Sequence, residues 1–332
     1  MTSVPELTPV EALIPVWQRV LQRPVIGVDS NFFDLGGNPA LAVQLVDEIA
    51  TYCGRELSPL IIYQAPTISA LAAVLDGSSS SLLQPLVLLK HGSTDPPVFV
   101  AHGLGGTVME LFDLVRHLPS PHPMFGLQAR GTDGADRPFE SIEDMGEFYA
   151  DCIRRLQPHG PYYLMGYSLG GLVMLETAQR LCASGEDVGL LAMIDSYPHS
   201  GHLSLAARAL LIMQRLRFRA SISKRTRTAP FQMPVAPAFA NNLERVRRSS
   251  YLALKRYRPR YYSGAVVFIR AATTTVFPRE PRAVWGRTVG KLEVETVPGD
   301  HLGLIAEHAA SLGAALSRHL ARALNSERGR TR

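Results

Sequence analysis

The chain has 332 residues, a hydrophobic content of 46% and a net charge of +5, which suits about two domains with substantial cores. No apolar run is long enough to cross a membrane, and no basic segment precedes an apolar one at the N-terminus, so we expect no membrane span, no secretory signal and a cytoplasmic location. The three cysteines are scattered, without cysteine or histidine neighbours at metal-ligand spacing, so we expect no metal site.

The charge is distributed unevenly along the chain. Residues 201–260 contain fourteen Lys and Arg and a single acid, Glu244, for a net charge of +13, whereas residues 1–77 have a net charge of −5. A basic run of this kind is either a solvated helix face or a surface that attracts an acidic partner, and the sequence leaves both readings open. We expect no nucleic-acid partner, but the acidic N-terminal segment could dock on the basic one.

The first 77 residues predict a small helical bundle. A helix is expected over residues 8–22, with Thr8 as its cap and Pro9 at its first position. A long loop follows, and then come a helix from about Pro39 to Thr51, a short turn over residues 57–65 and a helix over residues 67–75. Three helices in about 75 residues form a compact bundle. The small polar residues that follow predict a linker over residues 78–85.

Two short motifs in this unit indicate a family. Residues 31–37 read Asn-Phe-Phe-Asp-Leu-Gly-Gly and residues 65–68 read Ala-Pro-Thr-Ile. Over residues 6–77 the chain resembles a phosphopantetheine carrier domain of nonribosomal peptide or polyketide assembly lines. The resemblance implies an attachment serine two residues after the double glycine, where this chain has Pro39. Because proline has no hydroxyl, we expect no attached phosphopantetheine, and we interpret residues 1–77 as a docking or stabilising module.

The rest of the chain alternates short apolar runs with helical patterns. Helical patterns are expected over residues 108–117, 142–156 and 172–184, and strands over residues 86–89, 98–101, 124–127, 162–165, 189–194, 265–269 and 292–297. This alternation predicts a mostly parallel sheet covered on both faces. A dinucleotide-binding fold of similar layout is set aside because the chain lacks the G-x-G-x-x-G motif.

A nucleophile is predicted at Ser168. It is the centre of Gly166-Tyr167-Ser168-Leu169-Gly170, which lies between an expected buried strand and an expected helix. In a G-x-S-x-G turn between strand and helix, the serine is held at the top of the sheet with its hydroxyl exposed. The alternative is a plain tight turn, since small residues are common between strands and helices; the strand before the motif and the helix after it favour the nucleophile.

A serine hydroxyl needs a base, and the base an acid. We predict His301 as the base because it follows the last expected strand; His308 and His319 are expected on the surface of the next helix. We predict Asp195, at the end of the strand over residues 189–194, as the acid, although it could also be a turn aspartate before Pro198. Leu169 and Leu104 are predicted to supply backbone amides to an oxyanion hole, while His102 is expected to be structural.

These residues resemble the thioesterase domain that ends nonribosomal peptide and polyketide synthases, a subgroup of the α/β hydrolases. The resemblance spans residues 85–322 and includes Gly166–Gly171, Asp195 with Tyr197-Pro198, and Gly299-Asp300-His301. It implies an α/β hydrolase domain over residues 86–325 with a helical lid at about 201–257, and it supports Asp195 as the acid.

We therefore predict a serine thioesterase that releases an acyl, peptidyl or polyketide chain by hydrolysis or cyclisation, through an acyl-enzyme and without a bound cofactor. Because Pro39 offers no attachment point, the substrate would arrive on the phosphopantetheine arm of an acyl or peptidyl carrier protein or synthase in trans. The alternatives are a carboxylester hydrolase, an editing thioesterase, or a docking protein of a synthase without catalytic activity.

Overall fold

The computed structural model describes residues 8–78, 83–202, 209, 212, 236–273, 277–278 and 280–330. The chain separates into two compact units. The first comprises Met1–Gln84, Gly131–Asp136 and Ala229–Leu243, and the second comprises Pro85–Arg130, Arg137–Thr228 and Glu244–Arg332. Among the described helices, none combines the length and the hydropathy that a membrane span requires.

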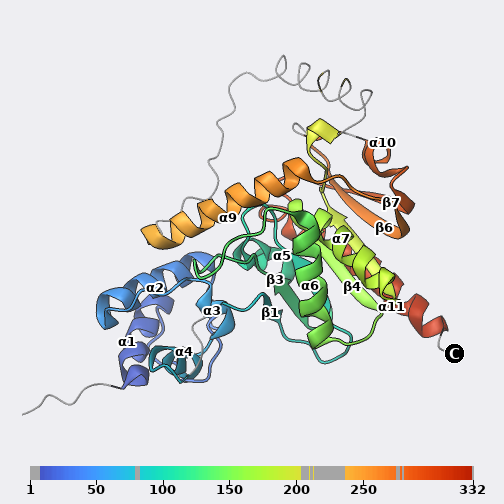
Figure 1. The fold of residues 1–332 in the computed structure, drawn as a ribbon. Coiled ribbons are helices and arrows are strands. Elements are labelled where there is room, and N and C mark those ends of the chain that lie inside the picture. Colours follow the sequence, from blue (N-terminus) through green and yellow to red (C-terminus); the bar gives the residue numbers. More distant parts are fainter. Residues whose placement is uncertain are drawn as a thin grey trace, which may run out of the picture. The chain divides into compact units, whose positions relative to one another are not determined.

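Residues 8–78 fold into short helices whose ends follow from the sequence. The helices are α1 (Pro9–Leu21), α2 (Pro39–Cys53), α3 (Ile61–Gln64) and α4 (Ile68–Leu75) (Figure 1). Thr8 caps α1 and exchanges hydrogen bonds with Glu11, and the Thr67 side chain accepts a hydrogen bond from the amide of Ala70 at the start of α4. Side-chain caps satisfy amides that have no partner within the helix, so these residues fix where each helix begins.

The core of this unit is aromatic and aliphatic. Trp17 and Phe32 are fully buried, and their rings meet edge to face with centroids 5.3 Å apart. Leu13, Leu45 and Ile49 are buried in the same cluster. The predicted helical bundle is therefore confirmed, with the addition of α3 in the region where only a turn was expected.

The second unit is built on a seven-stranded sheet of order β1-β3-β2-β4-β5-β6-β7. Only β1 is antiparallel to its neighbour, and the other pairs are parallel. The strands are β1 (Leu86–Lys90), β2 (Val98–Ala101), β3 (Met124–Leu127), β4 (Tyr162–Tyr167), β5 (Val188–Ile194), β6 (Tyr262–Ala271) and β7 (Val289–Val297).

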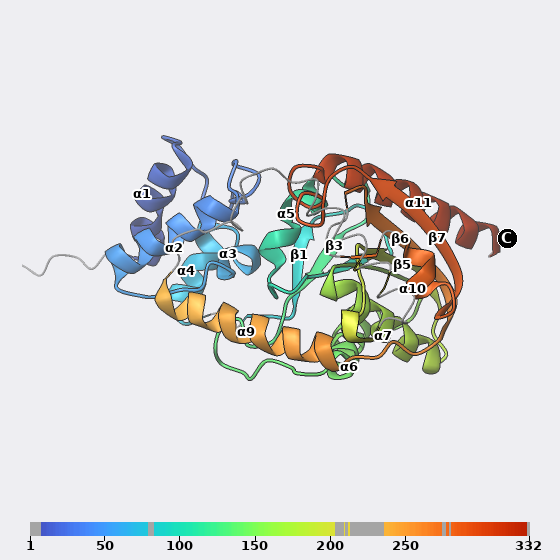
Figure 2. The same cartoon turned by 90° about the horizontal axis from the view of Figure 1, so that it is seen from above.

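Helices lie on both faces of this sheet, as Figure 2 shows from above, and a hydrophobic layer fills the space on each face. Side chains alternate along each strand: Phe99 packs in the layer that contains α6 and α7, whereas Val98 and Val100 pack in the layer that contains α5 and α11. The helical elements are η1 (Val108–Leu111), α5 (Phe112–Arg116), α6 (Ile142–Leu156), α7 (Leu169–Ala183), η2 (Ser200–His202), α9 (Pro237–Arg256), α10 (Pro281–Trp285) and α11 (Ala309–Arg330). The mostly parallel, doubly covered sheet of an α/β hydrolase is confirmed.

Several element boundaries differ from the sequence prediction. The helix expected over residues 108–117 is split into a 3₁₀ turn and a short α-helix, and α7 begins at Leu169, directly after the G-x-S-x-G serine. Of the lid expected at 201–257, the structure describes the end of η2, positions 209 and 212, residue 236, helix α9 and Tyr257. The rest of that segment, including nearly all of the basic stretch 208–227, lies outside the described residues.

Candidate active site

Ser168 lies between β4 and α7, at the carboxyl edge of the sheet. Its backbone has φ 55° and ψ −117°, a conformation that residues other than glycine rarely adopt. A Cβ added at Gly166 would lie 2.2 Å from the carbonyl oxygen of Gly170, and one added at Gly170 would lie 2.3 Å from that of His102. Since only glycine fits at both places, the turn keeps the shape that presents Ser168 at the amino end of α7.

Three polar side chains from distant parts of the sequence meet at this turn. Ser168 Oγ is 3.0 Å from His301 Nε2, and His301 Nδ1 is 2.8 Å from Asp195 Oδ2. A carboxylate accepts hydrogen bonds, so Nδ1 donates to Asp195 and Nε2 is left to accept from the Ser168 hydroxyl. The structure thus brings together the three residues that the sequence singled out.

Asp195 is held by the neighbouring strand β6. It is 1% exposed; its amide donates to the carbonyl oxygen of Ile269 at 2.7 Å, and its Oδ1 accepts from the amide of Ala271 at 3.3 Å. Its φ of 47° lies in the left-handed region, which aspartate tolerates better than most residues. Each carboxylate oxygen has a donor, one from His301 and one from β6, as a buried carboxylate requires.

Two aromatic rings enclose the His301 imidazole. The Tyr167 ring stacks on it with centroids 5.0 Å apart and an interplanar angle of 21°, and the Tyr167 hydroxyl donates to the carbonyl oxygen of His301 at 2.7 Å. Phe277 meets it edge to face at 4.9 Å. Burial raises the pKa of Tyr167, so its phenol stays neutral and remains a donor. These contacts restrict the imidazole to the orientation in which it reaches both Ser168 and Asp195.

Leu104 and Leu169, which the sequence predicted as oxyanion donors, lie in the loop after β2 and at the start of α7. No residue in the described ranges accepts a hydrogen bond from either amide. Leu169 is the first residue of α7, where the helix dipole favours negative charge. Leu104 lies in the loop after β2, in a turn closed by the Gly106 amide on the Gly103 carbonyl oxygen at 3.3 Å. Their role as oxyanion donors stays a prediction.

Comparison with known proteins assigns the family. Residues 96–322 match the family described as a thioesterase domain. The chain belongs to the thioesterase domain family. Residues 11–75 match a second family, described as a phosphopantetheine attachment site. Both matches agree with the resemblances read from the sequence motifs.

Relatives of this thioesterase domain occur in synthases. The dimodular nonribosomal peptide synthase of Bacillus subtilis (strain 168) is 35% identical over 286 residues, which cover 81% of this chain and 12% of that protein. The solved four-domain nonribosomal peptide synthetase AB3403 shares the fold, with a TM-score of 0.60 and 23% identity over 97% of this chain and 27% of its own. The NocB thioesterase domain, solved in covalent complex with a fluorophosphonate nocardicin G analog, has a TM-score of 0.53 and 25% identity over 68% of this chain and 95% of its own. The chain therefore spans a small part of the length of the curated synthase that it matches.

The carrier-like unit has Pro39 at the position where the attachment serine is expected. Pro39 is the first residue of α2, and the side chain of Asn38 caps the helix by accepting a hydrogen bond from the amide of Leu41 at 3.0 Å. A Cβ added at Gly37 would lie 2.3 Å from the Phe32 ring, so the glycine loop is closely packed. The position keeps the shape of a helix start, but its side chain has no oxygen that could join a phosphate, so these residues do not fit a covalently attached arm.

Two residues near the thioesterase site, His102 and Glu110, hold the loop after β2. His102 is fully buried, with Nδ1 2.6 Å from the carbonyl oxygen of Gly103 and Nε2 2.8 Å from the Tyr149 hydroxyl. Burial lowers the pKa of His102 to about 4, so it is neutral at pH 7 and donates from Nδ1 to the carbonyl. No role was predicted for Glu110 from the sequence. Its position inside an otherwise apolar stretch could have indicated a buried carboxylate.

The prediction that His319 lies at the surface is wrong. His319 is 3% exposed, and its Nε2 is 2.7 Å from Glu295 Oε2. The physical reason is that β7 is the edge strand of the sheet, and its carboxylates Glu293 and Glu295 face α11 and bind Arg322, Arg318 and His319 there. His308 precedes α11 and is half-buried.

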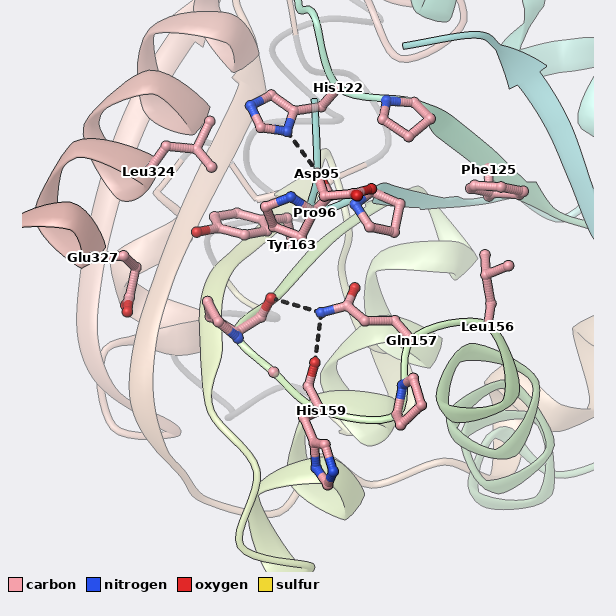
Figure 3. A pocket seen from close by; sticks show the side chains of 15 residues that line it. Asp95, Pro96, His122, Phe125, Leu156, Gln157, His159, Tyr163, Leu324 and Glu327 are labelled. Carbon is pink, nitrogen blue, oxygen red and sulfur yellow. Dashed lines mark hydrogen bonds between the residues drawn. The ribbon is translucent and has the colours of Figure 1, made fainter. Parts of the chain in front are cut away.

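A cavity of about 750 Å³ lies at the amino ends of the strands, away from the triad (Figure 3). Its walls come from the starts of β2 and β4, the loop after α6 and the end of α11. Its buried histidine, His122, donates from Nδ1 to the carbonyl oxygen of Pro96 at 2.8 Å. Ser168, Asp195 and His301 do not line this cavity.

Proposed function

We propose that the chain is a serine thioesterase that releases an acyl, peptidyl or polyketide chain from a thioester on a phosphopantetheine arm. The observation that supports it best is the hydrogen-bonded series Ser168–His301–Asp195 at the amino end of α7 in a member of the thioesterase domain family. The proposal assigns residues 86–325 to this domain, residues 1–77 to the carrier-like unit and residues 78–85 to the linker.

In the proposed reaction, His301 Nε2 takes the proton of the Ser168 hydroxyl as Oγ attacks the thioester carbonyl carbon. The oxyanion of the tetrahedral intermediate accepts hydrogen bonds from the amides of Leu104 and Leu169. When the intermediate collapses, the C–S bond breaks, His301 protonates the leaving thiolate, and an acyl ester of Ser168 remains. Asp195 keeps the imidazole in the required tautomer and stabilises its positive charge.

The acyl-enzyme is then resolved by an oxygen or nitrogen nucleophile. Water gives a free acid, whereas a hydroxyl or amine of the acyl chain gives a cyclic product. His301 removes the proton of the nucleophile and returns it to Ser168 Oγ. The same residues therefore serve hydrolysis and cyclisation.

The thioester donor is proposed to be a carrier domain of another protein. Pro39 offers no attachment point, and the names of the relatives indicate synthases that work on nonribosomal peptides. The described helix α9 exposes Arg245, Arg247 and Arg248, within the segment whose net charge is +13. An acidic carrier domain would be attracted by this charge, and the acidic residues 1–77 of the chain itself would compete for it.

Labelling with a fluorophosphonate tests the proposed activity. We expect the label on Ser168, detected by peptide mass spectrometry, together with release of product from acyl-pantetheine thioesters at rates above those for matched oxyesters. Absence of label on Ser168 would indicate a non-catalytic docking protein, and faster oxyester turnover would indicate a carboxylester hydrolase.

Salt dependence tests the proposed partner. Because salt screens charges over about 8 Å at physiological ionic strength, kcat/KM for a carrier-bound substrate should fall as salt rises, while a small neutral thioester should be unaffected. Deletion of residues 1–77 should raise the rate on the carrier-bound substrate if that segment competes for the basic surface. An unchanged rate in the truncated chain would exclude the competition, and a salt-independent rate in both would exclude the attraction.

A further inference from the structure

Glu110 lies over the loop that contains Leu104. It belongs to η1, directly after that loop, and its Oε1 accepts a hydrogen bond from the amide of Gly103 at 2.5 Å. Its Oε2 would be 3.3 Å from a Cβ at Gly103 and 3.5 Å from one at Gly105. The carboxylate therefore packs against two glycines whose lack of side chains makes room for it.

Gly103 is consequently held through both of its backbone polar groups. Glu110 accepts from its amide, and His102 Nδ1 donates to its carbonyl oxygen at 2.6 Å. That carbonyl belongs to the same planar peptide group as the amide of Leu104, so fixing the direction of one fixes the direction of the other. Donation to the carbonyl also polarises the peptide group and strengthens its amide as a donor.

We propose that Glu110 is a positioning residue of the oxyanion hole: its carboxyl oxygen fixes the Gly103 amide and, through this residue, aims the Leu104 amide at the oxyanion. The inference rests on the proposed function, because it assumes that Ser168 forms a tetrahedral intermediate. Glu110 acts through Gly103 and does not touch the substrate in this proposal.

The hydrogen-bond acceptor, rather than the negative charge, performs this role. Burial raises the pKa of Glu110 to about 7, while the Gly103 amide opposes the shift. The titratable side chain on the neighbouring strand is Tyr167, whose phenol stays neutral. Since a neutral carboxyl or carboxamide oxygen also accepts a hydrogen bond, Glu110→Gln retains the contact and Glu110→Ala removes it.

The test compares full-length variants by their steady-state kinetics on an acyl-pantetheine thioester and by inhibition with an acyl trifluoromethyl ketone. The ketone adduct with Ser168 has an oxyanion and so mimics the tetrahedral intermediate. We expect Glu110→Ala to lower kcat about 10- to 100-fold with KM changed less than about 2-fold, since loss of a whole oxyanion donor costs about 100- to 1,000-fold. The inhibition constant of the ketone should rise by about the same factor as kcat falls, because both report the oxyanion.

Two further variants separate positioning from folding. Glu110→Met keeps most of the side-chain volume without an acceptor and should behave as Glu110→Ala does, which preserves the test if the smaller residue prevents folding. Asp113→Ala removes an exposed acid of the next helix and should leave both constants unchanged. Glu110→Gln should stay within about 3-fold of the wild type.

The proposal is overturned if Glu110→Gln is as impaired as Glu110→Met, or if kcat falls while the inhibition constant of the ketone does not move. It is also overturned if Glu110→Met has wild-type kinetics. Failure of the proposed function looks different, because the wild-type protein would then take no fluorophosphonate label on Ser168.

Discussion

Two helices of this chain, α2 and α7, begin where the matched families lead us to expect a functional serine. They differ in the residue found there and in its backbone conformation. At the start of α2, Asn38 has an ordinary extended backbone and caps the helix with its side chain, and Pro39 occupies the first helical position. At the start of α7, Ser168 has a backbone conformation rare for serine and makes no side-chain cap. Its hydroxyl instead points to His301.

The difference shows how local stability and function compete for the same position. Asn38 and Pro39 together make a favourable helix start, because the cap satisfies an amide and proline gives up one that had no partner. Ser168 leaves the start of α7 uncapped and holds a strained backbone, which costs on the order of 1–3 kcal/mol. The first region has the residue that suits the helix, and the second has the residue that suits the proposed chemistry.

The sharpest test of this comparison is removal of the proposed catalytic groups. We expect Ser168→Ala and His301→Ala each to abolish acyl-enzyme formation, and Asp195→Asn to lower kcat by about 10³-fold or more, because the imidazole would lose its tautomer and its counter-charge. Turnover of an acyl-pantetheine thioester measures the effect. Near-normal turnover by Asp195→Asn would show that another group orients His301.

The converse experiment asks whether the first helix start can regain a function. Incubation with coenzyme A and a broad-specificity phosphopantetheinyl transferase should leave the mass of the wild-type chain unchanged, because Pro39 has no hydroxyl. Pro39→Ser should gain the mass of one phosphopantetheine, since the glycine loop and the helix start are intact. Pro39→Ala is the control and should stay unmodified. A mass gain by the wild-type chain would refute the proposed absence of the arm.

Acid should affect the two regions differently, because residues 1–77 contain no histidine. His102 has a pKa lowered to about 4 in the folded protein, against about 6.5 when unfolded. Between these values the unfolded chain binds more protons, so the thioesterase unit loses up to about 3 kcal/mol of stability from this group as the pH falls from 6.5 to 4.

Urea unfolding across this pH range, followed by the fluorescence of Trp285 in a Trp17→Phe background, measures this effect, since each unit contains one of the two tryptophans. The free energy of unfolding of His102→Gln, minus that of the wild type, should rise as the pH falls. Glu110 contributes to the pH dependence with the opposite sign, but it is present in both proteins and so cancels in this difference. A pH-independent difference between the two would refute the assignment of a neutral, buried His102.

The Asn38 cap of α2 should stabilise the first unit and have no effect on the thioesterase reaction. Asn38→Ala should destabilise α2 by about 1 kcal/mol, because the Leu41 amide loses its acceptor. Hydrogen exchange of peptides from α2, read by mass spectrometry, reports the loss. Thioesterase turnover is the control and should not change; a fall in turnover would show that this helix start also serves the reaction.

The smallest expected effect is a gain of stability at α7. Ser168→Gly should be more stable than Ser168→Ala by about 0.5–1 kcal/mol, because glycine adopts the strained conformation freely and this relief exceeds its greater chain entropy when unfolded. The same exchange measurement on peptides from α7 compares the two inactive variants directly. Equal exchange in both would mean that the turn stores no strain.

The sequence predicted best what depends on local pattern and chain order. Helix α6 has the predicted bounds because Ser141 caps its start and its apolar residues recur at helical spacing. Strands β2 and β3 also match, since each is a short apolar run in which every residue of β2 and all but Phe125 of β3 are buried. The residues Ser168, Asp195 and His301 could be selected because this fold uses its nucleophile, acid and base in a fixed order.

What the sequence missed depends on contacts between distant residues. Strand β6 begins at Tyr262, before its apolar run, because Tyr262 pairs with Val289 of β7; an irregularity at Ser263 and Gly264 precedes the regular pairing from Ala265 onward. The contact of Glu110 with Gly103 requires the 3₁₀ turn that replaces the first half of the expected helix. His319 is buried only because the edge strand supplies carboxylates to it, which no local pattern indicates.

One contact of Asp195 bears on which strand can supply the acid of the site. Its carboxylate accepts a hydrogen bond from the amide of Ala271 in β6, so the end of the neighbouring strand holds the acid that binds His301. Because the Ala271 amide lies beside the Asp195 carboxylate, an aspartate at position 271 or 272 tests whether the adjacent strand can supply the acid. We expect Asp195→Gly combined with Ala271→Asp or Ala272→Asp to regain part of the fluorophosphonate labelling that Asp195→Gly loses. Recovery of labelling would show that the acid can be supplied by β6 as well as by β5, whereas no recovery would show that the position of Asp195 is essential.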